Sequence, residues 1–215
     1  MKKIAFSDKY GLTQAVLEGR KTMTRRFVPE IVLDWNRRDK VVVNNFFLKG
    51  DLLMMDLSSI LGESYITAVP KEYQPRYQID EEVAIAQKYL DLKDCKAFYE
   101  ALAKADPTFP LECIKDEKGC YNKMFVKADW MPNRIKIINI RIEHLHDITE
   151  EDALKEGVEM VLYGDEEWYK VCDTKNGIKA ARTAKEAFAG IIDKLYRKGT
   201  WNINPWVFVY EFKLI

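Results

Sequence analysis

The final stretch of the chain, residues 206–214, constrains its fold more than any other. In "WVFVYEFKL" the large side chains of Trp206, Phe208, Tyr210 and Phe212 alternate with smaller or charged ones. Successive side chains of a β-strand point to opposite faces of a sheet, so this pattern predicts a strand with one aromatic face. An aromatic face needs an apolar partner, and we expect this strand to cover the core of a β-barrel.

A second long strand is predicted over "RIKIINIRIEH", residues 134–144. Its isoleucines alternate as far as Ile137 and start again in the opposite phase at Ile138. One extra residue on one strand of a pair is a β-bulge, and we expect a bulge between these two residues.

Two helices carry N-terminal capping signals. Thr149 precedes "EEDALKEG" with Asp152 as its expected capping partner, and Gly157 is the expected stop. Thr183 and Glu186 form the capping-box pattern of "TAKEAFAGIIDKLYRKG".

Shorter elements fill the rest of the chain. The residue patterns predict helices at 12–19 and 94–107, strands at 40–48 and 83–87, and a loop at 108–123. Strands mixed with short helices, without a repeating βαβ order, indicate the α+β class.

Because positive and negative side chains are equal in number, the protein as a whole has no strong electrostatic field. Acidic and basic residues number 34 each, and the pI is about 6.8. Any contact with nucleic acid must then use a local basic patch. No apolar run approaches the roughly 20 residues of a membrane helix, and we expect a cytoplasmic protein with no membrane partner.

Cysteine and histidine give no metal-site pattern. The cysteines contain no C-x-x-C pair, and we expect reduced, mostly buried thiols. They are Cys95, Cys113, Cys120 and Cys172. The two histidines, His144 and His146, are interpreted as exposed residues at a strand end, because two ligands alone rarely hold a metal. We expect no metal and no cofactor.

The densest basic stretch is "EGRKTMTRR", residues 18–26. On residue type alone it is typical of a solvated basic patch. Lys21 would act as a base only if burial or a neighbouring cation lowered its pKa. Lys21 and Thr24 would point to opposite faces of a regular strand, so they share a site only if the chain turns between them.

This stretch resembles the G-x-K-x-x-T-x-R signature of the ASCH domain family, whose members are small PUA-like β-barrels. Here the signature consists of Gly19, Lys21, Thr24 and Arg26. The segments "YQIDEEVAIAQKY", "MPNRIKIINIRIEHLHDITEEDALKEGV" and "GTWNINPWVFVYEF" resemble further parts of phage- and prophage-type members, in the same order.

The resemblance implies a single domain over residues 1–215, with short flanking helices around the barrel. Large insertions would lie at about 29–76, 90–123 and 158–182.

One bacterial branch of the family is an amidohydrolase that removes the acetyl group from N4-acetylcytidine. Carried over, its catalytic set implies Thr24 as nucleophile, Lys21 as base and Glu156 as proton donor. The same resemblance implies arginines that bind substrate, an oxyanion or an RNA phosphate. These are Arg20, Arg25 and Arg26.

Some positions depart from the family pattern. Asp80 and Glu81 stand where the family has Gly-Asp, and Ala84 and Gln87 replace an aromatic residue and a glutamate. Any role of that glutamate is therefore in doubt here.

Two other functions remain open. One is an RNA-binding module without catalysis, and the other, a metal-dependent ribonuclease, is disfavoured because no carboxylates cluster near the basic stretch. Trp201 and Trp206 are candidates for stacking a base, with core packing as the alternative. The expected partner is a modified nucleoside or RNA, no feature is specific for DNA, and the oligomeric state is open.

Overall fold

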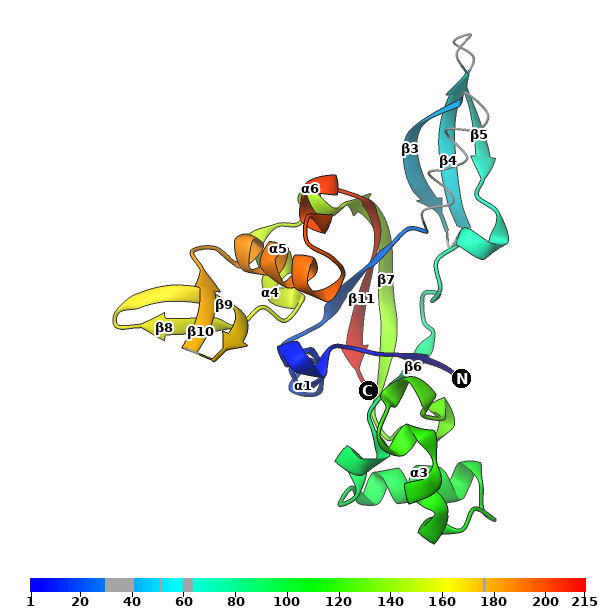
Figure 1. Ribbon diagram of the computed structural model, residues 1–215. Coiled ribbons are helices and arrows are strands. Elements are labelled where there is room, and N and C mark those ends of the chain that lie inside the picture. Colours follow the sequence, from blue (N-terminus) through cyan, green and yellow to red (C-terminus); the bar gives the residue numbers. More distant parts are fainter. Residues whose placement is uncertain (30–40, 51, 60–63, 176) are drawn as a thin grey trace.

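A five-stranded sheet forms the centre of the computed structural model, which describes residues 1–29, 41–50, 52–59, 64–175 and 177–215 (Figure 1). Its strands are β1 (Lys2–Ile4), β2 (Met23–Phe27), β6 (Glu82–Ile85), β7 (Arg134–His144) and β11 (Trp206–Leu214). The order is β1-β6-β7-β11-β2, with β1 and β6 parallel and the other neighbours antiparallel. With several short helices around it, the fold is mixed α+β.

The predicted β-bulge lies at Ile138. Asn139 pairs with Glu211 and Ile137 pairs with Phe212, so Ile138 is the extra residue on β7. Its side chain is 48% exposed, whereas Ile137 is fully buried. The change of phase in the isoleucine pattern therefore marks a real register shift.

Strand β11 is buried on both of its faces. Its aromatic face, including Phe208 and Tyr210, lies in a core shared with β1, β6 and β7. Val207 and Val209 on the opposite face lie in a second core formed with α4 (Glu150–Lys155) and α5 (Ala184–Leu195). The sheet therefore separates two hydrophobic cores.

The two edges of the sheet approach each other without pairing. The guanidinium of Arg26, on edge strand β2, donates a hydrogen bond to the carbonyl of Ala5, just after edge strand β1, over 2.9 Å. Among the described residues β1 and β2 share no backbone ladder, so the sheet is not a closed barrel there. The strand prediction for residues 206–214 is confirmed, and barrel membership stays a prediction.

Both helix caps form, but the capping boxes do not. The hydroxyls of Thr149 and Thr183 accept from the backbone N–H groups of Asp152 and Glu186. The Glu186 carboxylate accepts from the N–H of Arg182, and the Asp152 carboxylate binds distant arginines. Assigning Asp152 to a local cap was wrong, because two guanidinium groups compete for it.

The remaining helices are short. The α-helices are α1 (Leu12–Leu17), α3 (Lys96–Ala105) and α6 (Thr200–Ile203). The 3₁₀ helices are Asp8–Tyr10, Lys71–Tyr73, Tyr89–Leu92, Leu111–Asp116, Lys118–Cys120, Lys123–Phe125, Ala128–Trp130 and Leu145–Asp147. Three of them fall wholly or partly in residues 108–123, so predicting only a loop there was wrong. No helix in the described ranges is long and apolar enough to cross a membrane.

Two of the three predicted insertions contain small antiparallel sheets (Figure 1). Strands β3 (Val41–Lys49), β4 (Leu52–Ser59) and β5 (Ser64–Ala68) form one of them. Strands β8 (Met160–Tyr163), β9 (Glu166–Thr174) and β10 (Gly177–Ala181) form the other, and Val171 and Cys172 on β9 are buried against α5. Residues 158–182 are thus an anchored sheet with an exposed outer part.

The third predicted insertion, residues 90–123, contributes to a separate hydrophobic core. Helix α3 and the following 3₁₀ helices pack around Trp130, Tyr89 and Phe98. Ala84 and Ala86 from the β6 segment also lie in this core, so the insertion is joined to the central sheet through β6.

Candidate functional site

The chain turns before β2 and so places Lys21 outside the strand. Gly19 takes a left-handed conformation (φ +74°), and the N–H of Lys21 donates to the Ala15 carbonyl over 2.9 Å. The N–H of Thr22 donates to the Lys155 carbonyl, and β2 begins only at Met23. The alternation rule for strands therefore does not separate Lys21 from Thr24.

The ammonium group of Lys21 is buried against Glu156, the residue that ends α4. Its Nζ lies 2.7 Å from Glu156 Oε2 and 2.6 Å from the Glu156 carbonyl oxygen. The two side chains are only 2% and 5% exposed. The interpretation as a solvated patch is wrong for Lys21.

Burial lowers the pKa of Lys21 below its ordinary value of 10.5. The carboxylate of Glu156 opposes this effect, and the nearby guanidinium groups of Arg26 and Arg25 add to it. Arg25 also donates to Glu156 Oε1 over 3.1 Å. A neutral Lys21 would therefore leave Glu156 still paired with a cation.

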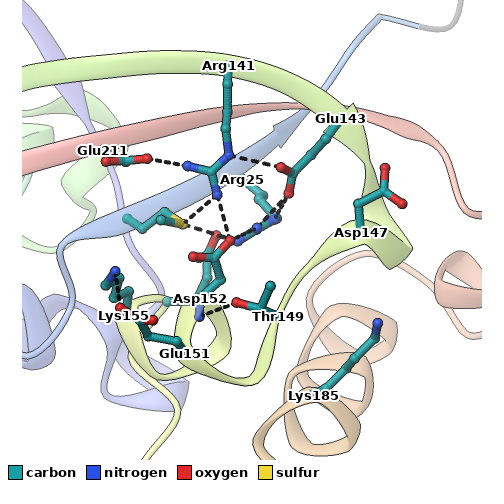
Figure 2. A network of polar contacts seen from close by, with 12 residues as sticks. Arg25, Arg141, Glu143, Asp147, Thr149, Glu151, Asp152, Lys155, Lys185 and Glu211 are labelled. Atoms are coloured by element: carbon teal, nitrogen blue, oxygen red, sulfur yellow. Dashed lines mark hydrogen bonds and ion pairs between the residues drawn. The ribbon is translucent and has the colours of Figure 1, made fainter.

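All three side-chain nitrogens of the Arg25 guanidinium donate hydrogen bonds to carboxylates. Its guanidinium lies 2.6 Å from Glu143 and 2.8 Å from Asp152, in addition to its bond to Glu156. Arg141 binds Glu143 and Asp152 from the other side and also pairs with Glu211 (Figure 2). This network orients Glu156 and leaves Arg25 no free edge for a substrate.

Thr24 is almost fully buried, with only 4% of its surface exposed. Thr24 lies on β2 opposite Tyr210, and its side chain has no hydrogen-bond partner among the described residues. Among all residues that the structure describes, no fully buried side-chain nitrogen or oxygen atom lacks a hydrogen-bond partner. The Thr24 hydroxyl must therefore be accessible from the cavity that Thr24 lines.

This cavity has a volume of about 230 Å³ and lies between the two sheet edges and α5. Its polar lining residues are Ser7, Lys21, Thr24, Arg25, Arg26 and Glu156. Its apolar wall consists of Phe6, Leu12, Phe188, Ile191, Ile192, Leu195 and Tyr196. The structure thus places the three predicted catalytic residues around one cavity, while their roles stay predictions.

The three candidate arginines differ in position. Arg26 lines the cavity, with one guanidinium nitrogen bound to the Ala5 carbonyl. Arg20 is exposed, pairs with Glu18 at 2.6 Å and does not line this cavity. Arg25 also lines the cavity, but its guanidinium is bonded to three carboxylates, so Arg26 is the arginine of this stretch that is placed to contact a ligand.

Trp201 and Trp206 stack on histidines instead of lining the cavity. The ring centroids of Trp206 and His144 are 3.8 Å apart, and those of Trp201 and His146 are 4.5 Å apart. Both histidines are half-buried, so the interpretation as exposed strand-end residues was wrong. Their ring nitrogens contact backbone carbonyl oxygens.

The departures from the ASCH pattern have local structural roles. Asp80 takes a left-handed conformation (φ +66°), as a glycine would in that turn, and pairs with Lys136 at 2.8 Å. Gln87 accepts a hydrogen bond from Asn133 and does not line the cavity.

Sequence reasoning missed the carboxylates and the arginine around Arg25. Glu143 and Arg141 come from the polar face of β7, and Asp152 resembles a local cap, so no sequence signal joins them to β2. Among the described residues no group of three or more His, Cys, Asp or Glu side chains is arranged to hold a metal ion.

Comparisons of this chain with protein-family models, curated proteins and solved structures found no match.

Proposed function

We propose that this protein is an amidohydrolase that removes the acetyl group from N4-acetylcytidine-type substrates. The observation that carries the proposal is a buried lysine of lowered pKa, bonded to Glu156 in a cavity that a free Thr24 hydroxyl also lines. The resemblance to the ASCH signature supports the same residues. The close approach of the two sheet edges supports the PUA-like form of the fold.

In the first half-reaction, Thr24 Oγ1 attacks the acetyl carbonyl carbon while neutral Lys21 accepts the hydroxyl proton. Lys21 passes a proton to Glu156 across their 2.7 Å hydrogen bond. The C–N bond then breaks, and Glu156 gives this proton to the leaving N4 amine. Cytidine leaves, and the acetyl group remains as an ester on Thr24.

The second half-reaction restores the enzyme. Water attacks the ester carbonyl and gives one proton to Lys21. The bond to Thr24 Oγ1 breaks, the Thr24 oxygen takes that proton back from Lys21, and acetic acid leaves and releases its remaining proton to solvent as acetate. Arg25 keeps Glu156 in position throughout, because its bonds to Glu143 and Asp152 do not change.

The cavity fits the reacting end of such a substrate. Ligand pockets generally measure about 300–1,000 Å³, and this cavity, at about 230 Å³, suits a base and its acyl group better than a complete nucleotide. Phe6, Phe188 and Tyr196 offer apolar and aromatic walls to a planar base.

The test is incubation of the purified protein with N4-acetylcytidine, followed by chromatography for cytidine and acetate. We expect both products in equal amounts, with the same rate in the presence of EDTA. Thr22→Ala is the control variant and should keep the wild-type rate, because Thr22 does not line the cavity. No cytidine above the uncatalysed rate would contradict the proposal.

Binding without catalysis is the second candidate. It is supported by Arg26 at the cavity and by a neighbouring cleft that Lys3, Lys71, Arg76 and Lys123 also line. In that case the protein would bind the nucleoside or RNA with no turnover. Lys21→Ala would then weaken RNA binding modestly, and Thr24→Ala would have little effect.

A further inference from the structure

A second and larger space adjoins the cavity. This cleft measures about 780 Å³ and shares Ala5 and Arg26 with the cavity. One side belongs to β1 and β2, and the other to the 3₁₀ helix Lys71–Tyr73 and the segment that follows it. A ligand in the cavity that extends past Arg26 therefore enters the cleft.

The cleft carries a large excess of positive charge. Its cationic lining residues are Lys3, Arg26, Lys71, Arg76 and Lys123. Glu72 is its one acidic lining residue in the described part of the chain. Lys123 pairs with Asp8 at 2.6 Å, whereas the other four cations have no carboxylate partner among the described residues. Their mutual repulsion favours binding of an anion.

Backbone carbonyl groups hold three of the cations, Lys3, Arg26 and Lys123. The ammonium of Lys3 donates to the carbonyls of Met124 and Val126 over 2.8 and 2.6 Å. Burial lowers the pKa of Lys3, and the charge of Arg76 adds to that effect. The Arg76 guanidinium lies 5.6 Å from the centre of the Tyr77 ring. Lys3, Arg26 and Lys123 are therefore placed before any ligand arrives, whereas Lys71 and Arg76 are exposed side chains of the cleft.

Aromatic side chains also line the cleft. They are Phe27, Tyr77, Phe208 and Tyr210. The Tyr77 hydroxyl donates to the Lys3 carbonyl, and the Tyr210 hydroxyl accepts from the N–H of Arg76, so both rings are fixed. Tyr77, Phe208 and Tyr210 are only 3%, 3% and 1% exposed, so these rings form part of the cleft wall, and the exposed cations are the groups that a ligand would meet.

We propose that this cleft binds the ribose-phosphate part of the substrate, so that the acetylated base in the cavity belongs to a nucleotide. The inference rests on the proposed function for the identity of the base. Arg26, at the boundary of the two spaces, contacts the phosphate nearest the base. Arg76 and Lys71 contact phosphoryl groups further along the cleft.

A free nucleotide and an RNA strand present the same phosphoryl chemistry. The binding test uses the Thr24→Ala variant, which does not consume its ligand. Titration calorimetry compares N4-acetylcytidine, its 5′-monophosphate and a five-nucleotide RNA with N4-acetylcytidine at its centre. We expect at least one phosphorylated ligand to bind about tenfold or more tightly than the nucleoside.

The pattern of affinities identifies the source of the phosphate. A further gain from monophosphate to RNA supports a strand, and equal affinity of the two supports a free nucleotide. Equal affinity of all three ligands, or binding of none, would overturn the proposal.

Two substitutions in the cleft give an independent readout. Arg76→Gln and Lys71→Gln should each weaken binding of the phosphorylated ligand several-fold and reduce its salt dependence by about one unit of slope for RNA. Arg182→Gln is the matched control, because Arg182 is an exposed arginine that follows β10 and does not line the cleft. Full retention of phosphate-dependent binding in both cleft variants would contradict the assignment.

The two proposals fail separately. Phosphate-dependent binding without turnover of any substrate would contradict the proposed hydrolase activity but would still support the cleft as a phosphate-binding site. Turnover of the nucleoside with no advantage from phosphate would remove the cleft assignment alone.

Discussion

At the scale of single residues, the central feature is that Lys21 and Arg25 share one carboxylate. Both cations bind Glu156, and all three side chains are buried. A buried cation favours loss of its proton, and Lys21 is the member of the pair that can lose one, because arginine stays protonated. In the proposed mechanism this contact joins the base, Lys21, to the proton donor, Glu156.

The pH dependence of activity follows from the lowered pKa of Lys21. Because the reactive form is neutral lysine, kcat/KM should rise as pH increases through the pKa of Lys21, with a midpoint below 10.5. Activity is lost at acidic pH as Lys21 gains its proton. The measurement is a pH-rate profile with N4-acetylcytidine, and a rate independent of pH below 10.5 would contradict Lys21 as the base.

Arg25→Leu should destabilise the protein strongly. The substitution leaves buried Glu156 without its arginine and removes one cation from Glu143 and Asp152, for which we expect a loss of about 3–5 kcal/mol in the free energy of unfolding. Urea denaturation measures it. Arg20→Leu is the matched control from the same stretch and should change stability by less than about 1 kcal/mol, because its pair with Glu18 is exposed. Equal effects of the two substitutions would contradict the account.

At the scale of elements, the site depends on where α1 and α4 end. Gly157 follows Glu156 with φ +94°, and a Cβ there would lie 3.2 Å from Lys21 Cβ and 3.3 Å from Leu12 Cδ2. The end of α4 therefore touches the residue it must position.

Gly157→Ala should lower kcat more than it raises KM, because the added Cβ displaces Lys21 from Glu156, whereas Leu12 is the one residue of the apolar wall that it meets. Gly164→Ala is the control, since Gly164 also has a positive φ (+64°) but its Cβ would meet nothing within 4 Å. Steady-state kinetics of the two variants provides the measurement. Wild-type kcat in Gly157→Ala would show that the position of Lys21 is unimportant.

The sequence predicted those features that depend on neighbouring residues, and it failed for features that depend on residues far apart in the chain. The bulge at Ile138 was readable because alternation is a property of neighbouring residues. The caps at Thr149 and Thr183 were readable for the same reason. The carboxylate of Asp152 was misassigned because its partners, Arg25 and Arg141, lie on other strands.

At the scale of the whole molecule, one sheet connects three cores. Val83 and Ile85 of β6 face the first core, while Ala84 and Ala86 belong to the third, around Trp130. The insertion at 90–123 is therefore joined to the central sheet by alternate residues of one segment, and we expect it to unfold with that sheet.

Phe98→Ala tests this coupling. Phe98 is fully buried and stacks on Tyr89 with ring centroids 5.5 Å apart, so its loss should cost about 3–5 kcal/mol. We expect one transition, shifted equally when followed by far-ultraviolet circular dichroism and by tryptophan fluorescence. Two separate transitions would show that the third core is an independent unit.

The sequence indicated the α+β class and the residues around the cavity, but not the burial of Lys21 or the basic cleft. Strand alternation and a short signature are visible along the chain. The burial of Lys21 depends on α4, more than a hundred residues away, and the cleft joins Lys3 to Arg76 and Lys123. Long-range packing of this kind leaves no periodic pattern in the sequence.

The most direct test of the central claim is turnover of N4-acetylcytidine by Lys21→Ala, Thr24→Ala and the double variant. Base and nucleophile act as a unit, so each single substitution should abolish cytidine release and the double variant should be no worse than either. Lys96→Ala, on the exposed face of α3, is the control and should keep the full rate. Robust cytidine release by Lys21→Ala would contradict the lysine-base mechanism.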